Sequence, residues 1–479
     1  MNGFKMKEYM KRLFISATLV LVASLSIKAQ PYKGKQTSQV YAVPDWEQVQ
    51  ANPKLVLSDY QPYPVMDQDP ASIPALTKAP KGYRPFYISH YGRHGSRWLI
   101  NSEYYRDPVS FLKKANEEGM LTPKGQDVLR RIEKVEEASR GRYGELTRLG
   151  AEQHRQIAGR MFRNFPQVFK GDAEIDAKST IVIRCILSME AFCMRLKELN
   201  PKLQISNDAS NHDMYYMNYQ DKDKFFSKIT STPENSAILK AYRDKVFKPE
   251  RLTQSLLKDT SFFSTYNEKF GYKDNPDDLP HYTPMTLLYD LYQLTVNLPN
   301  TDLDIRLDDV VTLEELYGVN LYRNLGSYRY AGFCDMGQKV TPYRQTYLVK
   351  NIIETADQAI AKVGTDGRKS AGATLRFGHD SNLMPLCSIL NIDGAGVYEP
   401  DNDNVANVWN MEHYIPKAGN LQFIFYGKKN APVLIKVLLN EHEATLPVET
   451  DNFPYYEWEK VKAFYLNILE NSPIKDKFN

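Results

Sequence analysis

Residues 84–97 have the sequence RPFYISHYGRHGSR, which joins a β-prone segment to a cluster of basic side chains. Its first part, residues 84–91, is β-prone and mostly aromatic, which predicts a short strand that ends at a glycine. The residues that follow place the imidazole of His94 between the guanidinium groups of Arg93 and Arg97. In open α/β sheets, ligands bind at the carboxyl ends of the strands. We therefore expect His94 to lie in a functional site at the end of this strand.

Two later stretches place more polar side chains at the ends of predicted strands. Residues 179–185 contain a β-branched run that is typical of a buried strand, with Arg184 at its end. Residues 373–380 predict another strand and end in His379 and Asp380. Further strands are expected over residues 421–426 and 433–438. We expect the polar groups at these strand ends to meet the histidine of the first motif at one edge of the sheet.

Helical segments separate the predicted strands. Long, charged helical stretches occupy residues 103–165, and Thr147 is placed to cap one of them. The alternation predicts an α/β fold, a three-layer α/β/α sandwich around a mostly parallel sheet. Polar helical segments with few strand signals interrupt this alternation and predict an inserted, mainly α-helical lobe. The predicted domains are a signal peptide (1–29), an N-terminal surface arm without visible chemistry (30–80), an α/β core (81–206 and 336–479) and the helical lobe (207–335).

The amino terminus predicts export. Basic residues precede an apolar stretch over 13–27 that is too short for a membrane span, and Ala29 suits a cleavage site. We therefore expect a cleavable signal peptide, a periplasmic or secreted protein, and no membrane anchor after cleavage. Loss of residues 1–29 removes five basic residues and one acid, so the net charge falls from +3 to −1. That balance excludes a globally basic protein, and no nucleic-acid partner is expected.

The histidines and cysteines show no zinc-binding spacing, so neither a metal nor another cofactor is expected. The four cysteines allow three pairings into two disulfides in an oxidising compartment, and they also suit buried core positions. They are Cys185, Cys193, Cys334 and Cys387. The sequence leaves these alternatives open.

The first motif suits a phosphate ester. The planar guanidinium of arginine binds phosphate through two parallel hydrogen bonds, and two such groups flank His94. Their positive charge disfavours imidazolium and helps to keep the histidine in its neutral, nucleophilic form. Gly95 is expected to let the backbone pass close to the ligand. These residue types together indicate a histidine nucleophile that acts on phosphorus.

The motifs resemble the histidine acid phosphatase branch of the histidine phosphatase superfamily. The first motif is similar to that family's Arg-His-Gly-x-Arg signature, and His379-Asp380 is similar to its second motif, His-Asp or His-Ala-Glu. Residues 144–150 resemble the family's Leu-Thr-x-x-Gly helix start, and residues 184–192 resemble its Arg-x-x-x-Ser-x-x-Ala-Phe block. The resemblance implies a phosphoglycerate-mutase-like fold and a phosphoric monoester hydrolase.

The resemblance also implies a role for each site residue. His94 attacks phosphorus to give a phosphohistidine, Asp380 protonates the leaving alcohol, and water then releases the phosphate. The residues that match the family's phosphate-binding positions are Arg93, Arg97, Arg184 and His379. Negative charge on a bound phosphate raises the pKa of a neighbouring carboxyl group, so the best activity is expected below neutral pH.

The substrate class is less defined. Residues 89–97 most resemble the multiple inositol polyphosphate phosphatases and their bacterial relatives, which implies inositol polyphosphates such as phytate as substrates. Those enzymes usually carry His-Ala-Glu where this chain has His379-Asp380. The expected partner is a small-molecule phosphate monoester, and a broad-specificity acid phosphatase stays open. Two further alternatives are a mutase-type phosphotransferase and a phosphate-ligand binding protein without turnover.

The helical lobe offers one candidate cluster for additional phosphates. It consists of Lys222, Lys224 and Lys228. A solvated helix face explains the same spacing. The sequence makes no prediction of the oligomeric state.

Overall fold

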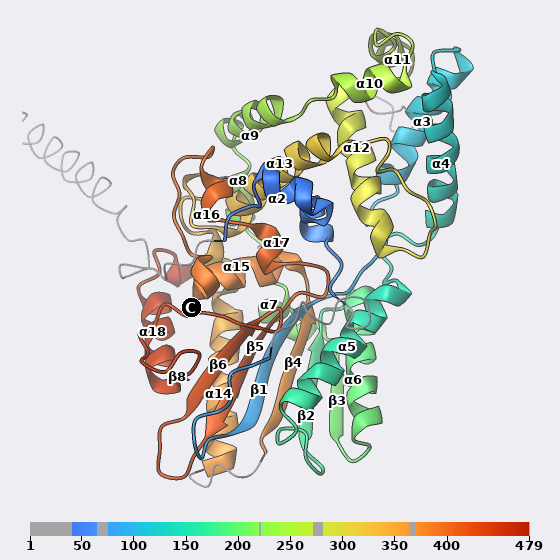
Figure 1. Cartoon of the computed structure of the whole chain (residues 1–479). Helices are drawn as coiled ribbons and strands as arrows, with labels where there is room; N and C mark the ends of the chain where they lie inside the picture. The colour runs from blue at the N-terminus through green and yellow to red at the C-terminus, as the bar shows by residue number, and fades with distance from the viewer. Residues whose placement is uncertain (1–40, 65–74, 220–221, 272–280, 365–369, 479) are drawn as a thin grey trace, which may run out of the picture. The chain divides into compact units, whose positions relative to one another are not determined.

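Residues 84–97 form a central strand, β1 (Arg84–Arg93), and the loop that follows it (Figure 1). The computed structural model describes residues 41–64, 75–219, 222–271, 281–364 and 370–478. The predicted signal peptide lies outside the described residues. Among those residues, no helix combines the length and the apolar character that a membrane crossing requires.

The described residues form an eight-stranded sheet in the order β3-β2-β4-β1-β5-β6-β7, with β8 paired to β6. The four neighbours β3, β2, β4 and β1 run parallel, while β5 is antiparallel to β1 and β6 is antiparallel to β5. The other strands are β2 (Glu174–Ser179), β3 (Gln204–Asp208), β4 (Gly372–Gly378), β5 (Asn420–Gly427), β6 (Leu434–Leu439), β7 (His442–Glu443) and β8 (Tyr456–Glu457). The α/β fold with a mostly parallel core is therefore confirmed.

The strand register brings several chain segments to one edge of this sheet. Arg93 at the end of β1 pairs with Gly378 at the end of β4, and Ser179 at the end of β2 pairs with Phe377. Because β5 runs in the opposite direction, its first residue, Asn420, lies at this same edge. The segments that leave β1, β2 and β4 and the segment that enters β5 therefore lie close together.

Helices cover both faces of the sheet, as Figure 1 shows. They are α5 (Arg148–Asn164) and α6 (Ile183–Leu199) on one face, with α14 (Thr346–Val363) and α18 (Trp458–Glu470) on the other. Ile88 of β1 packs in one apolar cluster with Ile157 of α5 and Phe192 of α6. The next residue of β1, Ser89, accepts a hydrogen bond from buried Arg376, which also binds α14. Successive side chains of a strand point to opposite faces, which produces the predicted three layers.

A second apolar cluster holds a helical lobe together. In it, the ring of Phe111 on α3 stacks on Phe263 of α11, with 4.7 Å between the ring centroids. Its helices are α3 (Glu103–Glu117), α4 (Pro123–Ser139), α10 (Glu250–Leu256), α11 (Phe262–Phe270), α12 (Pro284–Asn297) and α13 (Leu313–Ala331). The predicted lobe is therefore present, and it also includes α3 and α4, which the sequence analysis assigned to the α/β core.

Further helices complete the described chain. They are α2 (Trp46–Ala51), η1 (Pro53–Val56), η2 (Ser58–Tyr60), η4 (Asn211–Asp213), α7 (Met214–Met217), α8 (Phe225–Thr230), α9 (Pro233–Val246), η5 (Leu298–Asn300), η6 (Asp335–Gly337), η7 (Thr341–Gln345), α15 (Asp380–Leu390), η9 (Ile392–Gly394), α16 (Val405–Val408), α17 (Met411–Tyr414) and η10 (Lys475–Phe478). The predicted cap of α5 is confirmed, because Thr147 Oγ1 accepts a hydrogen bond from Gly150 N at 3.2 Å.

The predicted strand over residues 179–185 is wrong. β2 ends at Ser179, and α6 begins at Ile183. Thr180 is buried, but the isoleucines of the run are not, since Ile181 is 49% exposed and Ile183 is 70% exposed. Residues 180–182 form the connection from strand to helix, where the extended backbone of the N-cap residue Val182 also suits a β-branched side chain. Periodicity alone does not separate such a connection from a short buried strand.

The predicted surface arm is also corrected where the structure describes it. Val49 and Val56 pack in the apolar cluster of the helical lobe, and Tyr63 packs in the cluster beneath the sheet. Asp59 is buried as well and pairs with Arg93. The segment over residues 41–64 therefore contributes to both cores and to the site.

Candidate active site

The backbone fixes His94 at the carboxyl edge of the sheet. His94 N donates a hydrogen bond to Gly378 O at 2.9 Å, at the end of β4. His94 O accepts one from Ala418 N at 3.0 Å, and Arg93 N donates one to Gly419 O at 2.8 Å. The histidine is therefore held between the end of one parallel strand and the loop that enters β5.

A close approach between two glycines sets the course of the loop after His94. A Cβ atom on Gly95 would lie 2.3 Å from Gly150 O, and one on Gly150 would lie 2.2 Å from Ser96 O. Both contacts are too short for any side chain, so α5 reaches the motif only because both residues lack one. Gly95 thus serves the packing of the loop on α5, whereas the sequence analysis assigned it to backbone approach to the ligand.

The imidazole of His94 is buried and has a defined tautomer. Its Nδ1 lies 2.9 Å from Gly95 O. A carbonyl oxygen only accepts, so Nδ1 carries the proton and Nε2 keeps its lone pair. Burial lowers the pKa of His94 well below the usual value, and the charges of Arg97 and Arg184 lower it further. The side chain is therefore a neutral imidazole whose unprotonated nitrogen is Nε2.

The guanidinium group of Arg93 is fixed by protein oxygens. Its Nη1 donates to the carbonyl oxygens of Asp59 and Ile415, and its Nη2 donates to Asp59 Oδ2 at 3.0 Å. Its Nη2 also forms an ion pair with Asp380. The side chain of Arg93 is fully buried, so these contacts hold it rigidly beside His94.

All three arginines have a buried donor group without a partner among the described residues. Arg97 Nη1 donates to Trp98 O at 2.8 Å, whereas Arg93 Nε, Arg97 Nε and Arg184 Nε have no hydrogen-bond partner there. Arg184 lies in the first turn of α6, where the helix dipole disfavours a cation. Burial lowers its pKa, and the charge of Arg97 lowers it further. Buried, unpaired cationic donors are costly, and an anionic ligand would satisfy them.

His379 is the N-cap residue of α15, and Asp380 is the first residue of this helix. The rings of His379 and His94 lie 5.8 Å apart between centroids, at 71° to each other. Burial and the charge of Arg184 lower the pKa of His379 to about 4. Burial raises the pKa of Asp380, but Arg93 and Lys417 outweigh it and hold this pKa below the usual value. Asp380 is therefore a carboxylate at neutral pH, and its side chain, 30% exposed, opens toward solvent.

Three charged residues of the site were missed by the sequence analysis. Asp59 Oδ1 binds Arg323 of α13, and Asp59 Oδ2 lies 3.9 Å from the ammonium of Lys417. Burial raises the pKa of Asp59, but Arg323, Lys417 and Arg93 together hold it well below the usual range. No motif surrounds these three residues. Only the antiparallel direction of β5 would have placed Lys417 at this edge, and strand direction is not readable from the local sequence.

The structure thus brings together the six predicted residues, and their individual roles stay predictions. The lysine cluster at residues 222, 224 and 228 is different. All three side chains are exposed beside or on α8, as expected for a solvated helix face. Their role in binding further phosphates is not supported.

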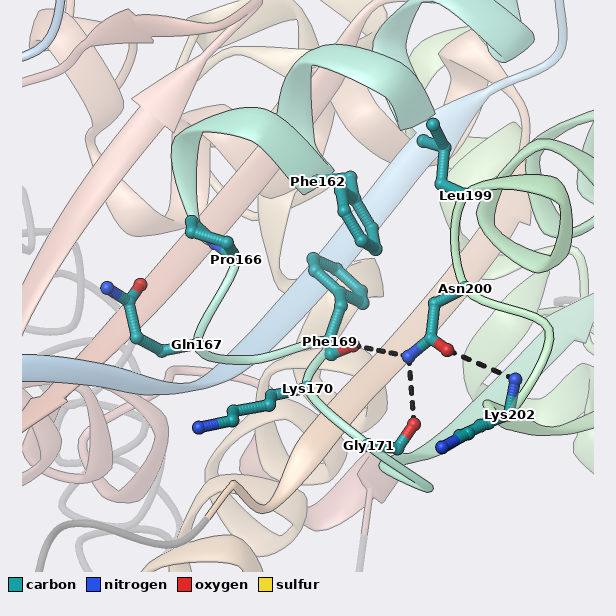
Figure 2. Close-up of a pocket in the computed structure, with 9 residues that line it drawn as sticks. All are labelled: Phe162, Pro166, Gln167, Phe169, Lys170, Gly171, Leu199, Asn200 and Lys202. Carbon is teal, nitrogen blue, oxygen red and sulfur yellow. Dashed lines mark hydrogen bonds between the residues drawn. The ribbon is translucent and has the colours of Figure 1, made fainter.

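A separate pocket lies at the other end of α5 and α6 (Figure 2). Asn200 occupies one side, where its Nδ2 donates to Phe169 O and Gly171 O at 2.8 Å each. Its Oδ1 accepts from Lys202 N at 3.1 Å. The lining residues are Phe162, Pro166, Gln167, Phe169, Lys170, Gly171, Leu199, Asn200 and Lys202. Since the amide of Asn200 is satisfied internally and no predicted site residue is present, this pocket is a feature of the helix ends.

The structure also shows the state of the cysteines and of the potential metal ligands. All four cysteines are free, buried thiols. The structure therefore places them at core positions and not in disulfide bonds. Among the described residues, no three histidine, cysteine, aspartate or glutamate side chains gather in a way that would hold a metal ion.

The fold and the site define a class. A family model described as the histidine phosphatase superfamily (branch 2) matches residues 92–440, which include all six predicted residues. The chain belongs to this superfamily and is a phosphoric monoester hydrolase by class.

The individual proteins that resemble this chain have low sequence identity to it. Human multiple inositol polyphosphate phosphatase 1 is 24% identical over 349 residues, which cover 68% of this chain and 67% of the human protein. The multiple inositol polyphosphate phosphatase of Bifidobacterium longum, solved with inositol hexasulfate, is similar with a TM-score of 0.70 and 18% identity. That match covers 88% of this chain and 99% of the other. A phytase from D. castellii has a TM-score of 0.58 at 12% identity, covering 90% and 92% of the two chains. These solved structures show the shared fold.

Proposed function

We propose that this chain hydrolyses phosphate monoesters through a phosphohistidine on His94 and that inositol polyphosphates are its substrates. One observation carries the proposal. The buried, neutral imidazole of His94 commits Nδ1 to Gly95 O and leaves Nε2 free among three guanidinium groups. A nucleophile with a fixed lone pair beside fixed cations is the arrangement that phosphoryl transfer requires.

In the first step, Nε2 of His94 attacks phosphorus, and the bond from phosphorus to the alcohol oxygen breaks. Asp380, in its protonated form, gives its proton to that oxygen, so the alcohol leaves neutral. In the second step, water attacks the phosphohistidine, Asp380 takes up a proton from it, and inorganic phosphate leaves with His94 restored. Arg97, Arg184 and Arg93 stabilise the charge on the phosphoryl oxygens throughout.

The pH dependence follows from Asp380. In the empty site its carboxylate is paired with Arg93, and the ion pair favours the ionised form. A bound phosphate competes for Arg93 and adds negative charge, and both effects raise the pKa of Asp380. Since the acid must be protonated to act, activity should rise as the pH falls below neutral.

The relatives support inositol polyphosphates over a simple monoester. The human and Bifidobacterium longum relatives are both multiple inositol polyphosphate phosphatases, and the second was solved with inositol hexasulfate.

The test is phosphate release from a panel of inositol phosphates and simple monoesters, with the released positions identified. His94→Ala should lower kcat at least a thousandfold, about 4 kcal/mol in barrier. His281→Ala, an exposed histidine of the helical lobe, is the matched control and should retain full activity. Mass spectrometry after an alkaline quench should find phosphate on His94, since phosphohistidine is labile in acid. Full activity of His94→Ala would refute the mechanism, and preference for simple monoesters would refute the substrate class.

We also propose export to the periplasm or the medium, based on the basic and apolar amino-terminal residues. Fractionation of expressing cells and sequencing of the mature amino terminus test it. An uncleaved cytoplasmic product would overturn it.

A further inference from the structure

Thr180 follows β2 and packs against the end of β4. Its backbone N donates a hydrogen bond to Phe377 O at 3.0 Å. Its methyl carbon lies over the next residue of β4, because a Cβ atom on Gly378 would be 3.5 Å from Thr180 Cγ2. Thr180 is completely buried, unlike its neighbour Ile181. The fold therefore fixes Thr180 beside the strand end that leads into His379.

The hydroxyl group of Thr180 contacts the imidazole of His379. Thr180 Oγ1 lies 3.2 Å from His379 Nε2, and both side chains are buried. Burial and the charge of Arg184 lower the pKa of His379 to about 4, so near neutral pH the ring is neutral and carries a single proton. A neutral imidazole donates through one nitrogen and accepts through the other. The contact with Thr180 therefore bears on which nitrogen can donate to a ligand.

The surroundings of the hydroxyl group favour donation from Thr180 to the ring. The alternative acceptor is the sulfur of Cys185, whose thiol donates to Gly378 O at 3.2 Å. This sulfur also lies 3.8 Å from both ring nitrogens of His379. Sulfur is a weak acceptor, so the buried hydroxyl hydrogen is better satisfied by Nε2 of the ring. Nε2 then accepts, and the proton of His379 stays on Nδ1.

Two buried, neutral histidines thus acquire different chemistry from their hydrogen bonds. His94 commits its proton on Nδ1 to Gly95 O and keeps a lone pair on Nε2, as a nucleophile requires. His379 receives a hydrogen bond on Nε2 and keeps its proton on Nδ1, as a donor to phosphate requires. The two ring centroids are 5.8 Å apart, so a phosphoryl group on His94 would lie within hydrogen-bonding reach of His379.

We propose that Thr180 is a positioning residue of the phosphatase site, whose hydroxyl group orients the imidazole of His379 and holds it in the tautomer that donates to the substrate phosphate. The inference rests on the proposed function and on the predicted phosphate-binding role of His379. Without the hydroxyl group, the ring can rotate or adopt the other tautomer, and the donor is then misplaced. One orienting hydrogen bond of this kind corresponds to about a five- to tenfold change in affinity.

Two substitutions separate the hydroxyl group from the methyl group in the full-length protein. Thr180→Val keeps the shape of the side chain, and Thr180→Ser keeps the hydroxyl group. Thr180→Val should raise the Kd of inorganic phosphate and lower kcat/KM on p-nitrophenyl phosphate about five- to tenfold. Thr180→Ser should stay within about twofold of the wild type in both measurements.

Thr253→Val is the matched control. Thr253 is a buried threonine of α10, where its Oγ1 donates to Glu250 O at 3.0 Å, and α10 lies away from the sheet (Figure 1). This substitution removes a buried hydroxyl group outside the site. The Kd of phosphate and kcat/KM should therefore keep their wild-type values.

A double-mutant cycle tests whether Thr180 acts through His379. In a His379→Ala background, Thr180→Val should change the Kd of phosphate by no more than about twofold, because the group that the hydroxyl orients is already absent. An equal loss in both backgrounds overturns the inference, since Thr180 would then act by another route. Wild-type values in Thr180→Val also overturn it, and so does an equal loss in Thr180→Val and Thr180→Ser, which would assign the effect to packing.

A second comparison applies if Thr180→Val does not fold. Thr180→Ala and Thr180→Ser both lack the methyl group at Cγ2, and the alanine variant alone lacks the hydroxyl group. The alanine variant should show the five- to tenfold loss relative to the serine variant, and equal values in the two would overturn the inference. Failure of the wild type to release phosphate from phytate and from p-nitrophenyl phosphate would refute the proposed function, while the Kd of phosphate would still test the role of Thr180.

Discussion

Replacement of His154 by leucine should make the protein more resistant to acid. His154 lies on α5, buried near the rings of Phe192 and Phe377. Neither of its ring nitrogens has a hydrogen-bond partner in the described part of the chain. Burial lowers its pKa from 6.5 to about 3. The folded protein therefore keeps His154 neutral at a pH where the unfolded chain binds a proton to it.

The magnitude follows from this difference. Between pH 6.5 and pH 3 the unfolded state binds more protons, so the free energy of unfolding decreases as the pH falls. At about pH 4.5 the unfolded histidine lies two units below its pKa, which costs the fold about 3 kcal/mol relative to neutral pH. Leucine does not titrate and fits an apolar site of this size. The stability of His154→Leu relative to the wild type should therefore improve by about 3 kcal/mol between about pH 7.5 and 4.5.

Urea unfolding of both proteins at the two pH values measures this change, whatever leucine does to stability at neutral pH. His281→Leu serves as the control, since an exposed side chain is solvated in the folded and unfolded chains alike. Its effect should be the same at both pH values. A difference between His154→Leu and the wild type that does not change with pH would refute the reasoning.

Three further predictions follow from the site. Asp380→Asn should lower kcat/KM on phytate about 10²- to 10⁴-fold. The loss on p-nitrophenyl phosphate should be much smaller, because its leaving group needs no proton. Initial rates on both substrates measure the difference. Asp59→Asn should lower the free energy of unfolding in urea by about 3–5 kcal/mol, because it leaves buried cations without a counter-ion. Asp244→Asn, in an exposed pair with Lys240, should leave the unfolding midpoint unchanged. Inorganic phosphate at about 100 times its Kd should stabilise the fold by about 3 kcal/mol through the unpaired arginine donors, and chloride at equal ionic strength should not.

Local sequence was sufficient wherever a residue's role depends on its chain neighbours. The strand over residues 84–91, the cap at Thr147 and the pairing of His379 with Asp380 at a strand end all agree with the structure. Each of these features spans only a few residues. Patterns of burial, turn chemistry and capping act over that range, which is why they can be read directly from the chain.

The remaining features depend on long-range contacts. Asp59 lies 34 residues from Arg93 along the chain, and Arg323 lies 264 residues from Asp59. Their ion pairs exist only because the tertiary fold brings three segments together, and no local pattern marks them. The strand prediction over residues 179–185 is wrong for the opposite reason. Its β-branched side chains satisfy a local pattern for burial, but tertiary structure leaves Ile183 exposed at the start of a helix.

The burial that makes His94 a nucleophile also sets the acid limit of the enzyme. Burial lowers the pKa of His94 well below the usual value, which favours its neutral form, whereas Asp380 gains its proton as the pH falls. The catalytic rate should therefore keep rising as the pH falls, and the stability of the fold then limits the activity. His90 and His154 are buried with pKa values of about 3, so each lowers stability as soon as the pH drops below 6.5. The acid side of the activity profile should thus report unfolding rather than chemistry, and His154→Leu should extend it downward without a change in kcat at neutral pH.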